Sequence, residues 1–210
     1  MKFKIGVMGS AQGPAIAQAE NKKKAMAVGR AIAEHNCILV NGACFGLPHD
    51  AAIGAKDADG FTLGISPAFS LKEHIERYKS PDAEKYDIII FTGLGLMTRD
   101  IVNIRTSDAV VIIGGGVGTL NEFTVAFDEG RYIGVLTKTD GISDHIPDII
   151  EKCHRELGDR VIFDDDPERL IARLVDLLKN GERMLVADQR VVGLDFQFEQ
   201  FEKGKKIENE

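Results

Sequence analysis

Residues 114–122 combine the groups that a site for a phosphorylated ligand requires. The segment reads GGGVGTLNE and follows the apolar run 110–113. Glycines can turn several backbone N–H groups inward and, having no side chains, they let a phosphate approach closely. The start of a following helix adds unpaired N–H donors and a partial positive charge. Thr119 can add a hydroxyl donor, and Glu122 places a carboxylate three residues further along the chain.

A capping box explains part of the same segment without any ligand. In residues 119–122 the threonine would cap a helix, and the glutamate would reach back to the backbone N–H of the cap. This interpretation leaves the four glycines unexplained, although a glycine loses more chain entropy on folding than any other residue. We therefore expect four residues of the segment to bind phosphate: Gly115, Gly116, Gly118 and Thr119.

Two further glycine-bearing loops follow predicted strands, and none of the three loops matches a known nucleotide fingerprint. The glycines of the first, MGSAQG, do not fit G-x-G-x-x-G, and the strand before the second ends in Asn41 where a ribose-binding acid would stand. The third loop lacks the lysine of a Walker loop. NAD-type and ATP-type loops are therefore excluded. We still expect Gly9, Ser10 and Gly42 to line a nucleotide site. The side chains of Ser10 and Gln12 could contact a base or sugar, and the alternative for both residues is an ordinary role in a turn.

Arg99 is suited to clamp the phosphate of a ligand. It follows TGLGLMT and begins the predicted helix that precedes the strand 109–113. A guanidinium at the end of a strand can hold a phosphate through two parallel hydrogen bonds. The alternative for this residue, taken by itself, is a surface cation.

Other polar clusters have structural explanations. His49 and Asp50 look like the start of a helix, and residues 164–166 precede a helix whose N-terminus favours acidic caps. We therefore expect no metal site and no cofactor.

Short β-branched apolar runs alternate with segments of helical period. The predicted strands are residues 3–8, 37–40, 61–65, 87–91, 109–113, 132–137 and 161–163. The predicted helices are residues 17–35, 50–57, 99–106, 120–129, 146–157 and 167–179. Strands this apolar are buried on both faces, which predicts an α/β fold with a doubly wound parallel sheet and helices on both faces. Such sheets bind ligands at the carboxyl ends of their strands, where the glycine loops lie.

Composition restricts the class of partner and the compartment. A net charge of −7 argues against a protein that grips nucleic acid or an acidic membrane by bulk charge. No apolar stretch approaches the roughly 20 residues that span a bilayer, and the N-terminus shows no signal core. The cysteines are far apart in the sequence, which predicts reduced thiols with no chemical role in a reducing cytosol: Cys37, Cys44 and Cys153. We expect a cytoplasmic protein with a small-molecule ligand.

The chain length suits one sizeable domain with an extension. We assign residues 1–180 to a single nucleotide-binding domain and 181–210 to a C-terminal extension. Within the domain, the polar segment 66–85 reads as an excursion with one short helix. The extension ends in a charged run typical of a frayed tail, but three aromatic residues leave docking on the domain or on a second subunit open: Phe196, Phe198 and Phe201.

The order of these motifs resembles that of the LOG family, phosphoribohydrolases once mislabelled lysine decarboxylases. The segment MTRDIVNIRTSDAVVIIGGGVGTLNE, residues 97–122, carries the signature of an arginine, a Ser-Asp-Ala strand and a G-G-x-G-T-x-x-E loop. Residues 38–67 are similar to the earlier glycine turn, small-residue helix and G-x-x-P strand end of the family. Together the motifs cover about residues 3–137.

The resemblance implies a Rossmann-like homodimer that binds a nucleoside 5′-monophosphate and hydrolyses its N-glycosidic bond. Arg99 and Glu122 fall on the family's catalytic pair, and the glycine loop falls on its phosphate site. An ionised carboxylate can stabilise an oxocarbenium-like transition state or activate water, and a helix N-terminus would favour that form of Glu122. No lysine stands out for the decarboxylase chemistry of the older label.

Three departures from the family pattern keep a second function open. Gly114 replaces the family's proline, Asp100 replaces a frequent lysine, and Gly42-Ala43 replaces an early Gly-Gly. These features are similar to those of relatives that resemble molybdenum-cofactor carrier proteins. The alternative function is therefore a non-catalytic carrier of a phosphorylated ligand, either a nucleotide or a molybdopterin-type cofactor.

Overall fold

The computed structural model describes residues 1–81 and 83–185, with side chains as far as residue 181. The chain separates into two compact units, Met1–Leu178 and Lys179–Glu210. The sheet and the site below belong to the first unit. The three phenylalanines of the predicted extension, Phe196, Phe198 and Phe201, lie outside the described residues.

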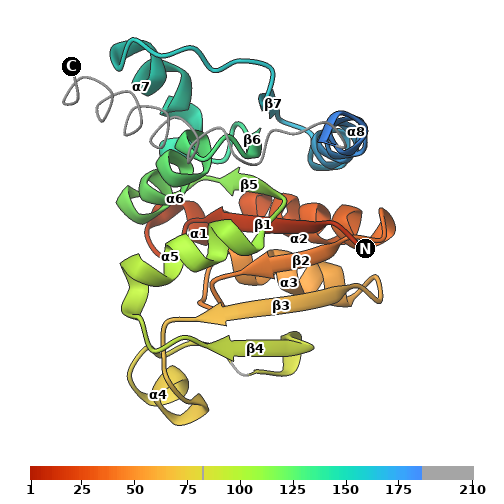
Figure 1. The fold of residues 1–210 in the computed structure, drawn as a ribbon. Coiled ribbons are helices and arrows are strands. Elements are labelled where there is room, and N and C mark those ends of the chain that lie inside the picture. Colours follow the sequence, from red (N-terminus) through yellow and green to blue (C-terminus); the bar gives the residue numbers. More distant parts are fainter. Residues whose placement is uncertain (82, 186–210) are drawn as a thin grey trace, which may run out of the picture. The chain divides into compact units, whose positions relative to one another are not determined.

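The first unit is built on a parallel sheet with the strand order β4-β3-β2-β1-β5-β6-β7 (Figure 1). The strands are β1 (Lys4–Gly9), β2 (Ile38–Asn41), β3 (Phe61–Ser66), β4 (Ile88–Phe91), β5 (Ala109–Ile113), β6 (Tyr132–Leu136) and β7 (Val161–Asp164). At the centre, β1 pairs with β5 from Ile5 opposite Ala109 to Gly9 opposite Ile113. Because the neighbouring strands are parallel, their carboxyl ends share one edge of the sheet.

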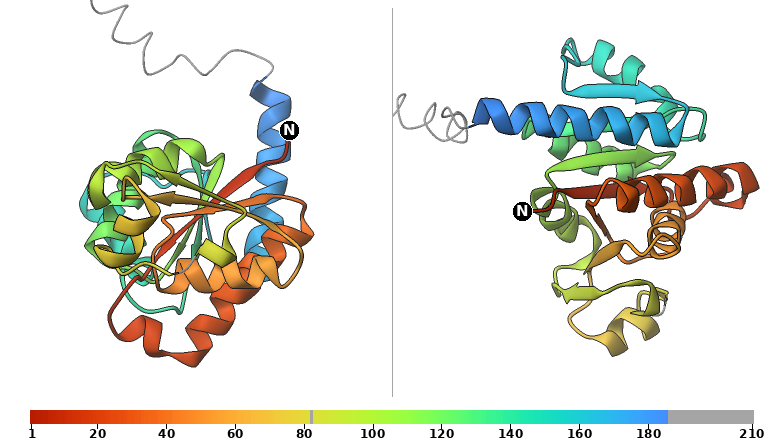
Figure 2. Two further views of the ribbon diagram at one scale, coloured as in Figure 1. Left: turned by 90° about the horizontal axis from the view of Figure 1, so that it is seen from below. Right: turned by 90° about the vertical axis from the view of Figure 1, so that its right-hand side faces the viewer.

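Helices cover both faces of the sheet (Figure 1 and Figure 2). On one face lie α2 (Ala19–Glu34), α3 (Leu47–Lys56) and the first part of α8 (Pro167–Leu185). On the other face lie α5 (Gly95–Thr106), α6 (Val117–Asp128) and α7 (Ile146–Lys152). All five residues of β5 are buried, which explains its unbroken apolar run. The predicted doubly wound α/β fold is confirmed.

Small residues bring α2 and α3 close together. An ideal Cβ at Gly29 would overlap the carbonyl oxygen of Ala51, and one at Gly54 would overlap that of Met26. Larger side chains would therefore separate these two helices. Their close packing explains the alanine-rich sequence of both segments.

The strand order reverses between the neighbouring strands β1 and β5. From β1 the strands extend outward to β4, whereas from β5 they extend to β7 on the opposite side. After β1, residues 10–13 lead into the short helix α1 (Pro14–Ala17). After β5, residues 114–116 lead into α6. Such a switch point opens a crevice between the two loops, where doubly wound proteins bind ligands.

Three helices begin earlier than the sequence predicts. The first is α3, which begins at Leu47, three residues before its predicted start and directly after Gly46, whose φ is 107°. The first residue of α5 is Gly95, four residues before the predicted start, and that of α6 is Val117, three residues before it. Glycines with positive φ also precede these two starts, with 65° at Gly93 and 98° at Gly115. These glycines complete the turn within few residues, so each helix follows at once.

The segment 66–85 is an excursion, as predicted. It contains α4 (Leu71–Glu76) and the 3-10 turn η1 (Ala83–Lys85). His74 is fully buried, with its Nδ1 2.9 Å from Ser66 Oγ and its Nε2 3.2 Å from the carbonyl oxygen of Pro81. These contacts tie the excursion to the end of β3.

Among the described residues, none of the helices is long and apolar enough to cross a membrane. The cytoplasmic location stays a prediction of the sequence.

Candidate ligand site at the carboxyl ends of β1 and β5

Ser10 joins the three loops that meet at the switch point. Its backbone N–H donates to the carbonyl oxygen of Ile113 at the end of β5 (3.1 Å), and its Oγ accepts from the N–H of Gly115 (2.7 Å). Its carbonyl oxygen accepts from the N–H of Leu47, where α3 begins (2.9 Å). The preceding Gly9 leaves room for this contact, because an ideal Cβ there would overlap the Ile113 carbonyl oxygen. The loop after β1 is thus fixed against the loops after β2 and β5.

The residues after β5 form a tight turn whose backbone is hydrogen-bonded to residues 139–143. Gly114 and Gly115 have φ values of 59° and 98°, a conformation that favours glycine. Their carbonyl oxygens accept from backbone N–H groups of the 3-10 turn η2 (Ile142–His145) at 3.0 and 2.9 Å. The N–H of Gly114 donates to Thr139 Oγ1 (2.9 Å). The shape of the turn is therefore set by the protein itself.

The start of α6 presents backbone donors to open space. Gly116 is the N-cap residue and has no side chain to accept from the N–H groups of the first turn. An ideal Cβ at Gly116 or Gly118 would meet no atom within 4 Å, and the side chain of Val117 is 81% exposed. Thr119, by contrast, is 4% exposed and packs against Gly115. Free N–H groups and the partial positive charge of the helix favour an anion at this position.

The capping box predicted for residues 119–122 is wrong. Because α6 begins at Val117, Thr119 is the third residue of the helix and Glu122 is the sixth. Side chains make no capping hydrogen bond to this helix. Glu122 instead lies beside Arg99 of α5.

Arg99, Asp100 and Glu122 form a buried charged cluster between α5 and α6. Their exposed fractions are 6%, 5% and 8%. Arg99 Nη1 lies 3.2 Å from Asp100 Oδ1 and 3.9 Å from Glu122 Oε1. Gly42 makes room for the guanidinium, because an ideal Cβ there would overlap Arg99 Nη1. The structure therefore brings Arg99 and Glu122 together and adds Asp100 as a third member.

Cys44 and Asn103 complete the surroundings of this cluster, and sequence analysis assigned neither of them to the site. Arg99 Nη2 lies 3.8 Å from Cys44 Sγ, and burial raises the pKa of this thiol. The side chain of the fully buried Asn103 lowers the pKa of Glu122, and its Nδ2 donates to Met8 Sδ (3.2 Å). Its spacing of four residues from Arg99 on a helix is a signal that could have found it. The contact of Cys44 spans 55 residues and leaves no local pattern.

Burial favours the protonated form of Glu122. It raises the pKa of this carboxyl to about 8, and the nearby Asp100 adds to this shift, while Arg99 and the side chain of Asn103 oppose it. Burial also raises the pKa of Asp100, against the attraction of Arg99. The shorter of the two ion pairs is that of Asp100, so we assign the negative charge to this residue. The expectation of an ionised Glu122 is wrong, because the side chain lies one turn beyond the helix start and away from water.

The remaining sequence candidates have structural roles. His49 and Asp50 lie in the first turn of α3. Asp166 Oδ1 accepts from the backbone N–H of Arg169 (2.8 Å) and caps α8. Asp164 forms an ion pair with the side chain of the same arginine. The expected helix start and the expected acidic cap are both confirmed.

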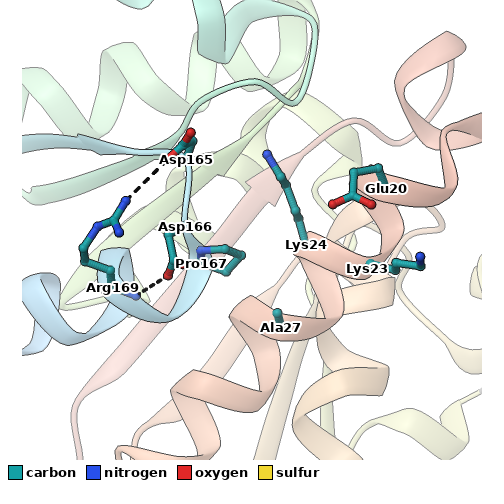
Figure 3. Close-up of a pocket in the computed structure, with 8 residues that line it drawn as sticks. All are labelled: Glu20, Lys23, Lys24, Ala27, Asp165, Asp166, Pro167 and Arg169. Carbon is teal, nitrogen blue, oxygen red and sulfur yellow. Dashed lines mark hydrogen bonds and ion pairs between the residues drawn. The ribbon is translucent and has the colours of Figure 1, made fainter.

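An opening of about 500 Å³ lies between α2 and the start of α8 (Figure 3). Side chains of both signs line it: Glu20, Lys23, Lys24, Asp165, Asp166 and Arg169. Two of its acidic groups already have partners, since Asp165 pairs with Lys138 and Arg169 and Asp166 caps α8. The opening contains neither the glycine turn nor the buried cluster. We therefore place the candidate ligand site at the switch point.

A doubly wound parallel sheet with an open glycine turn at its switch point defines an α/β protein of the Rossmann-like type. The sequence model of the SLOG cluster4 family matches residues 2–171, and the chain belongs to this family. The predicted resemblance to the LOG family, and to its relatives similar to molybdenum-cofactor carriers, is confirmed.

Known proteins with similar sequences or structures span most of the domain. An uncharacterized protein of Archaeoglobus fulgidus is 32% identical over 134 residues, which cover 64% of this chain and 80% of the relative. The structure of the molybdenum cofactor binding protein from Rippkaea orientalis is 28% identical, with a TM-score of 0.70 over 85% of this chain and 98% of that chain. The molybdenum cofactor carrier protein from Chlamydomonas reinhardtii is 29% identical, with a TM-score of 0.66 over 85% and 99%.

The raised pKa of Glu122 predicts that stability depends on pH. Its ordinary pKa is 4.5 and its pKa in the fold is about 8, so the folded protein binds more protons between these values and loses stability as the pH rises through them. Glu122→Gln removes this loss. The parent should lose on the order of 4 kcal/mol of free energy of unfolding between about pH 5 and about pH 9 that Glu122→Gln does not lose. Chemical denaturation at both pH values measures the difference.

The matched control is Glu151→Gln, which changes an exposed carboxyl on α7. Its free energy of unfolding should follow that of the parent at both pH values. A difference between Glu122→Gln and the parent that stays constant with pH would contradict the protonated state of Glu122.

Proposed function

We propose that the chain binds a nucleoside 5′-monophosphate and hydrolyses its N-glycosidic bond to free base and ribose 5-phosphate. The observation that carries this proposal is the buried cluster of Arg99, Asp100 and Glu122 beside an open glycine turn. Removing charged groups from water costs stability. A protein with apolar side chains of similar volume in such positions is often at least as stable as one with the charged groups. A cluster of shifted pKa values at a ligand crevice therefore favours a chemical role.

The phosphate of the ligand would lie on the glycine turn before α6. The N–H groups of the first helical turn and the partial positive charge of the helix attract it, and the space at Gly116 and Gly118 admits its oxygens. Arg99 Nε is buried without a hydrogen-bond partner among the described residues and supplies a further donor. Ser10 Oγ already accepts from the turn, so its own hydrogen is available to a ligand oxygen.

Glu122 would act as the proton donor of the reaction. A neutral carboxyl can protonate the leaving base as the C1′–N bond breaks and its electron pair moves to the base nitrogen. The sugar passes through an oxocarbenium-like transition state, the water oxygen bonds to C1′, and a proton of that water returns to Glu122. The ionised carboxylate of Asp100 would stabilise the positive charge that develops on the sugar. The guanidinium of Arg99 would contribute electrostatic stabilisation.

A carrier function without catalysis is the second candidate. The solved proteins from Rippkaea orientalis and Chlamydomonas reinhardtii are described as binding or carrying the molybdenum cofactor, and they are 28% and 29% identical to this chain. Gly114 and Asp100 also depart from the hydrolase pattern. A carrier would use the same glycine turn for a phosphorylated ligand but would have no need of a proton donor at Glu122.

Incubation with a panel of nucleoside 5′-monophosphates separates the two candidates. We expect the parent protein to release free base and ribose 5-phosphate from at least one of them. Glu122→Gln keeps the size of the side chain but cannot donate a proton as a carboxyl does, so the rate should fall at least about a hundredfold. Chromatography of the free base measures the reaction.

The surface variant Glu151→Gln controls for a general loss of activity and should turn over like the parent. Absence of turnover on every nucleotide, with a thermal shift still produced by nucleotides or by a phosphorylated pterin, would contradict the hydrolase and support the carrier.

Gly118→Val tests the phosphate position. The added side chain meets no protein atom within 4 Å at its Cβ, so we expect the variant to fold like the parent. The same side chain would occupy the space of the phosphate, and binding of nucleoside monophosphates should fall below detection in calorimetry. Unchanged affinity in a folded variant would remove the glycine turn from the site.

We also propose that two copies of the chain associate through an apolar surface on β4 and α5. Ile88 and Ile90 of the edge strand β4 are 50% and 45% exposed, and Leu96 and Met97 at the start of α5 are 51% and 55% exposed. Large apolar side chains on an edge strand favour burial against a partner. The resemblance to the LOG family makes a second copy the expected partner.

Ile90→Lys tests this surface. A charge in the apolar contact should convert a dimer into a monomer, as measured by sedimentation equilibrium at micromolar concentration. Glu151→Lys, a change on the exposed face of α7, should leave the mass of the parent unchanged. A monomeric parent, or a dimer that persists in Ile90→Lys, would contradict the proposed contact.

A further inference from the structure

The apolar side chain of Phe45 is exposed to solvent beside the candidate site. It lies in the loop between β2 and α3, and its side chain is 53% exposed. The loop belongs to the carboxyl edge of the sheet, where the glycine turn also lies. Neither of the two hydrophobic core clusters includes Phe45, so packing of the core does not account for it.

The backbone is fixed on both sides of Phe45. Before it, the N–H of Ala43 donates to Asn41 Oδ1 (2.8 Å). After it, Gly46 has a φ of 107° and lies so close to Ser10 that an ideal Cβ would overlap the Ser10 carbonyl oxygen. The position of the ring is therefore set by the loop, which reduces the entropy that a ligand contact would have to overcome.

The two chain neighbours of Phe45 place it between the two halves of the site. Cys44 lies 3.8 Å from Arg99 of the buried cluster. Gly46 lies against Ser10, which accepts a hydrogen bond from the glycine turn (2.7 Å). The loop that carries Phe45 thus forms a rim that contacts both Arg99 of the buried cluster and Ser10.

One ring contact orients Phe45 and leaves much of its surface uncovered. Its ring centroid is 5.8 Å from that of His49, with an angle of 78° between the planes, which is an edge-to-face arrangement. His49 Nδ1 is in turn 3.3 Å from the hydroxyl of the buried Tyr86. The ring is therefore supported from the protein side while about half of its side chain still faces solvent.

We propose that Phe45 is the stacking surface for the heterocyclic ring of the ligand and that it selects nucleotides over simple sugar phosphates. The inference rests on the proposed phosphate site, because a ligand with its phosphate on the glycine turn and its glycosidic bond near Glu122 extends toward this rim. Stacking on an aromatic side chain is tolerant of base identity, so Phe45 discriminates by the presence of a planar ring. Its loss should weaken nucleotide binding roughly tenfold and leave ribose 5-phosphate binding unchanged.

Phe45→Trp gives a direct readout, since the chain contains no tryptophan. The variant therefore carries a single indole at the proposed stacking position. Titration with adenosine 5′-monophosphate should change its tryptophan fluorescence, whereas saturating ribose 5-phosphate should change it far less. Glu122→Gln is included in every protein of this experiment, so that the nucleotide is not consumed.

Phe45→Ala measures the contribution to affinity, and Phe61→Ala is its matched control. Phe61 is 39% exposed and begins β3, at the amino end of the strands and opposite the site. By calorimetry, Phe45→Ala should bind adenosine 5′-monophosphate roughly tenfold more weakly and ribose 5-phosphate within twofold of the parent. Phe61→Ala should bind both ligands like the parent.

Three results would overturn the proposal: unchanged nucleotide affinity in Phe45→Ala, an equal loss for both ligands, or equal fluorescence changes with both. Failure of the parent to bind any nucleotide would overturn the stacking surface and the proposed function together. If the protein with an intact Glu122 binds nucleotides but does not hydrolyse them, only the proposed hydrolysis is contradicted. The proposed stacking surface would still be supported.

Discussion

The close approach of β1 to β5 at their carboxyl ends is the constraint on which the site depends. The backbone at Gly9 lies so near the carbonyl oxygen of Ile113 that no side chain fits between them. Ser10 then hydrogen-bonds to Ile113, Gly115 and Leu47, which fixes three loops relative to one another. Because the glycine turn is held in this way, the N-terminus of α6 can present its N–H groups without a side-chain cap. The protein itself therefore organises the backbone of the proposed anion site.

The electrostatics of the site follow from the packing of α5 against α6. That packing buries one guanidinium between two carboxyl groups, and the cluster is nearly neutral only when one carboxyl keeps its proton. Glu122 keeps it because it is buried and lies near Asp100, whereas Asp100 lies closer to Arg99. The fold thus places a neutral acid next to an ionised one. In glycoside hydrolysis two such carboxyl groups have different roles, because the neutral one donates a proton and the ionised one stabilises positive charge on the sugar.

Sequence patterns predicted the strands well and the helix starts less well. The run 109–113 was predicted with its observed bounds because a strand buried on both faces leaves an unbroken apolar signal. The start of α6 was misplaced because glycines in a turn and glycines in the first helical residues look alike in sequence. The protonation of Glu122 was not predictable, since it depends on burial by a helix distant in the chain. Cys44 and Phe45 were missed because their roles arise from loops that only the folded sheet brings together.

The first turn of α6 is the proposed binding position for the phosphate of the ligand. A crystal structure of Glu122→Gln with adenosine 5′-monophosphate bound tests this position most directly. We expect phosphate oxygens within hydrogen-bonding distance of the backbone N–H groups at the start of α6, with the base on the ring of Phe45. A phosphate bound instead in the opening between α2 and α8, beside Lys23 and Lys24, would contradict it.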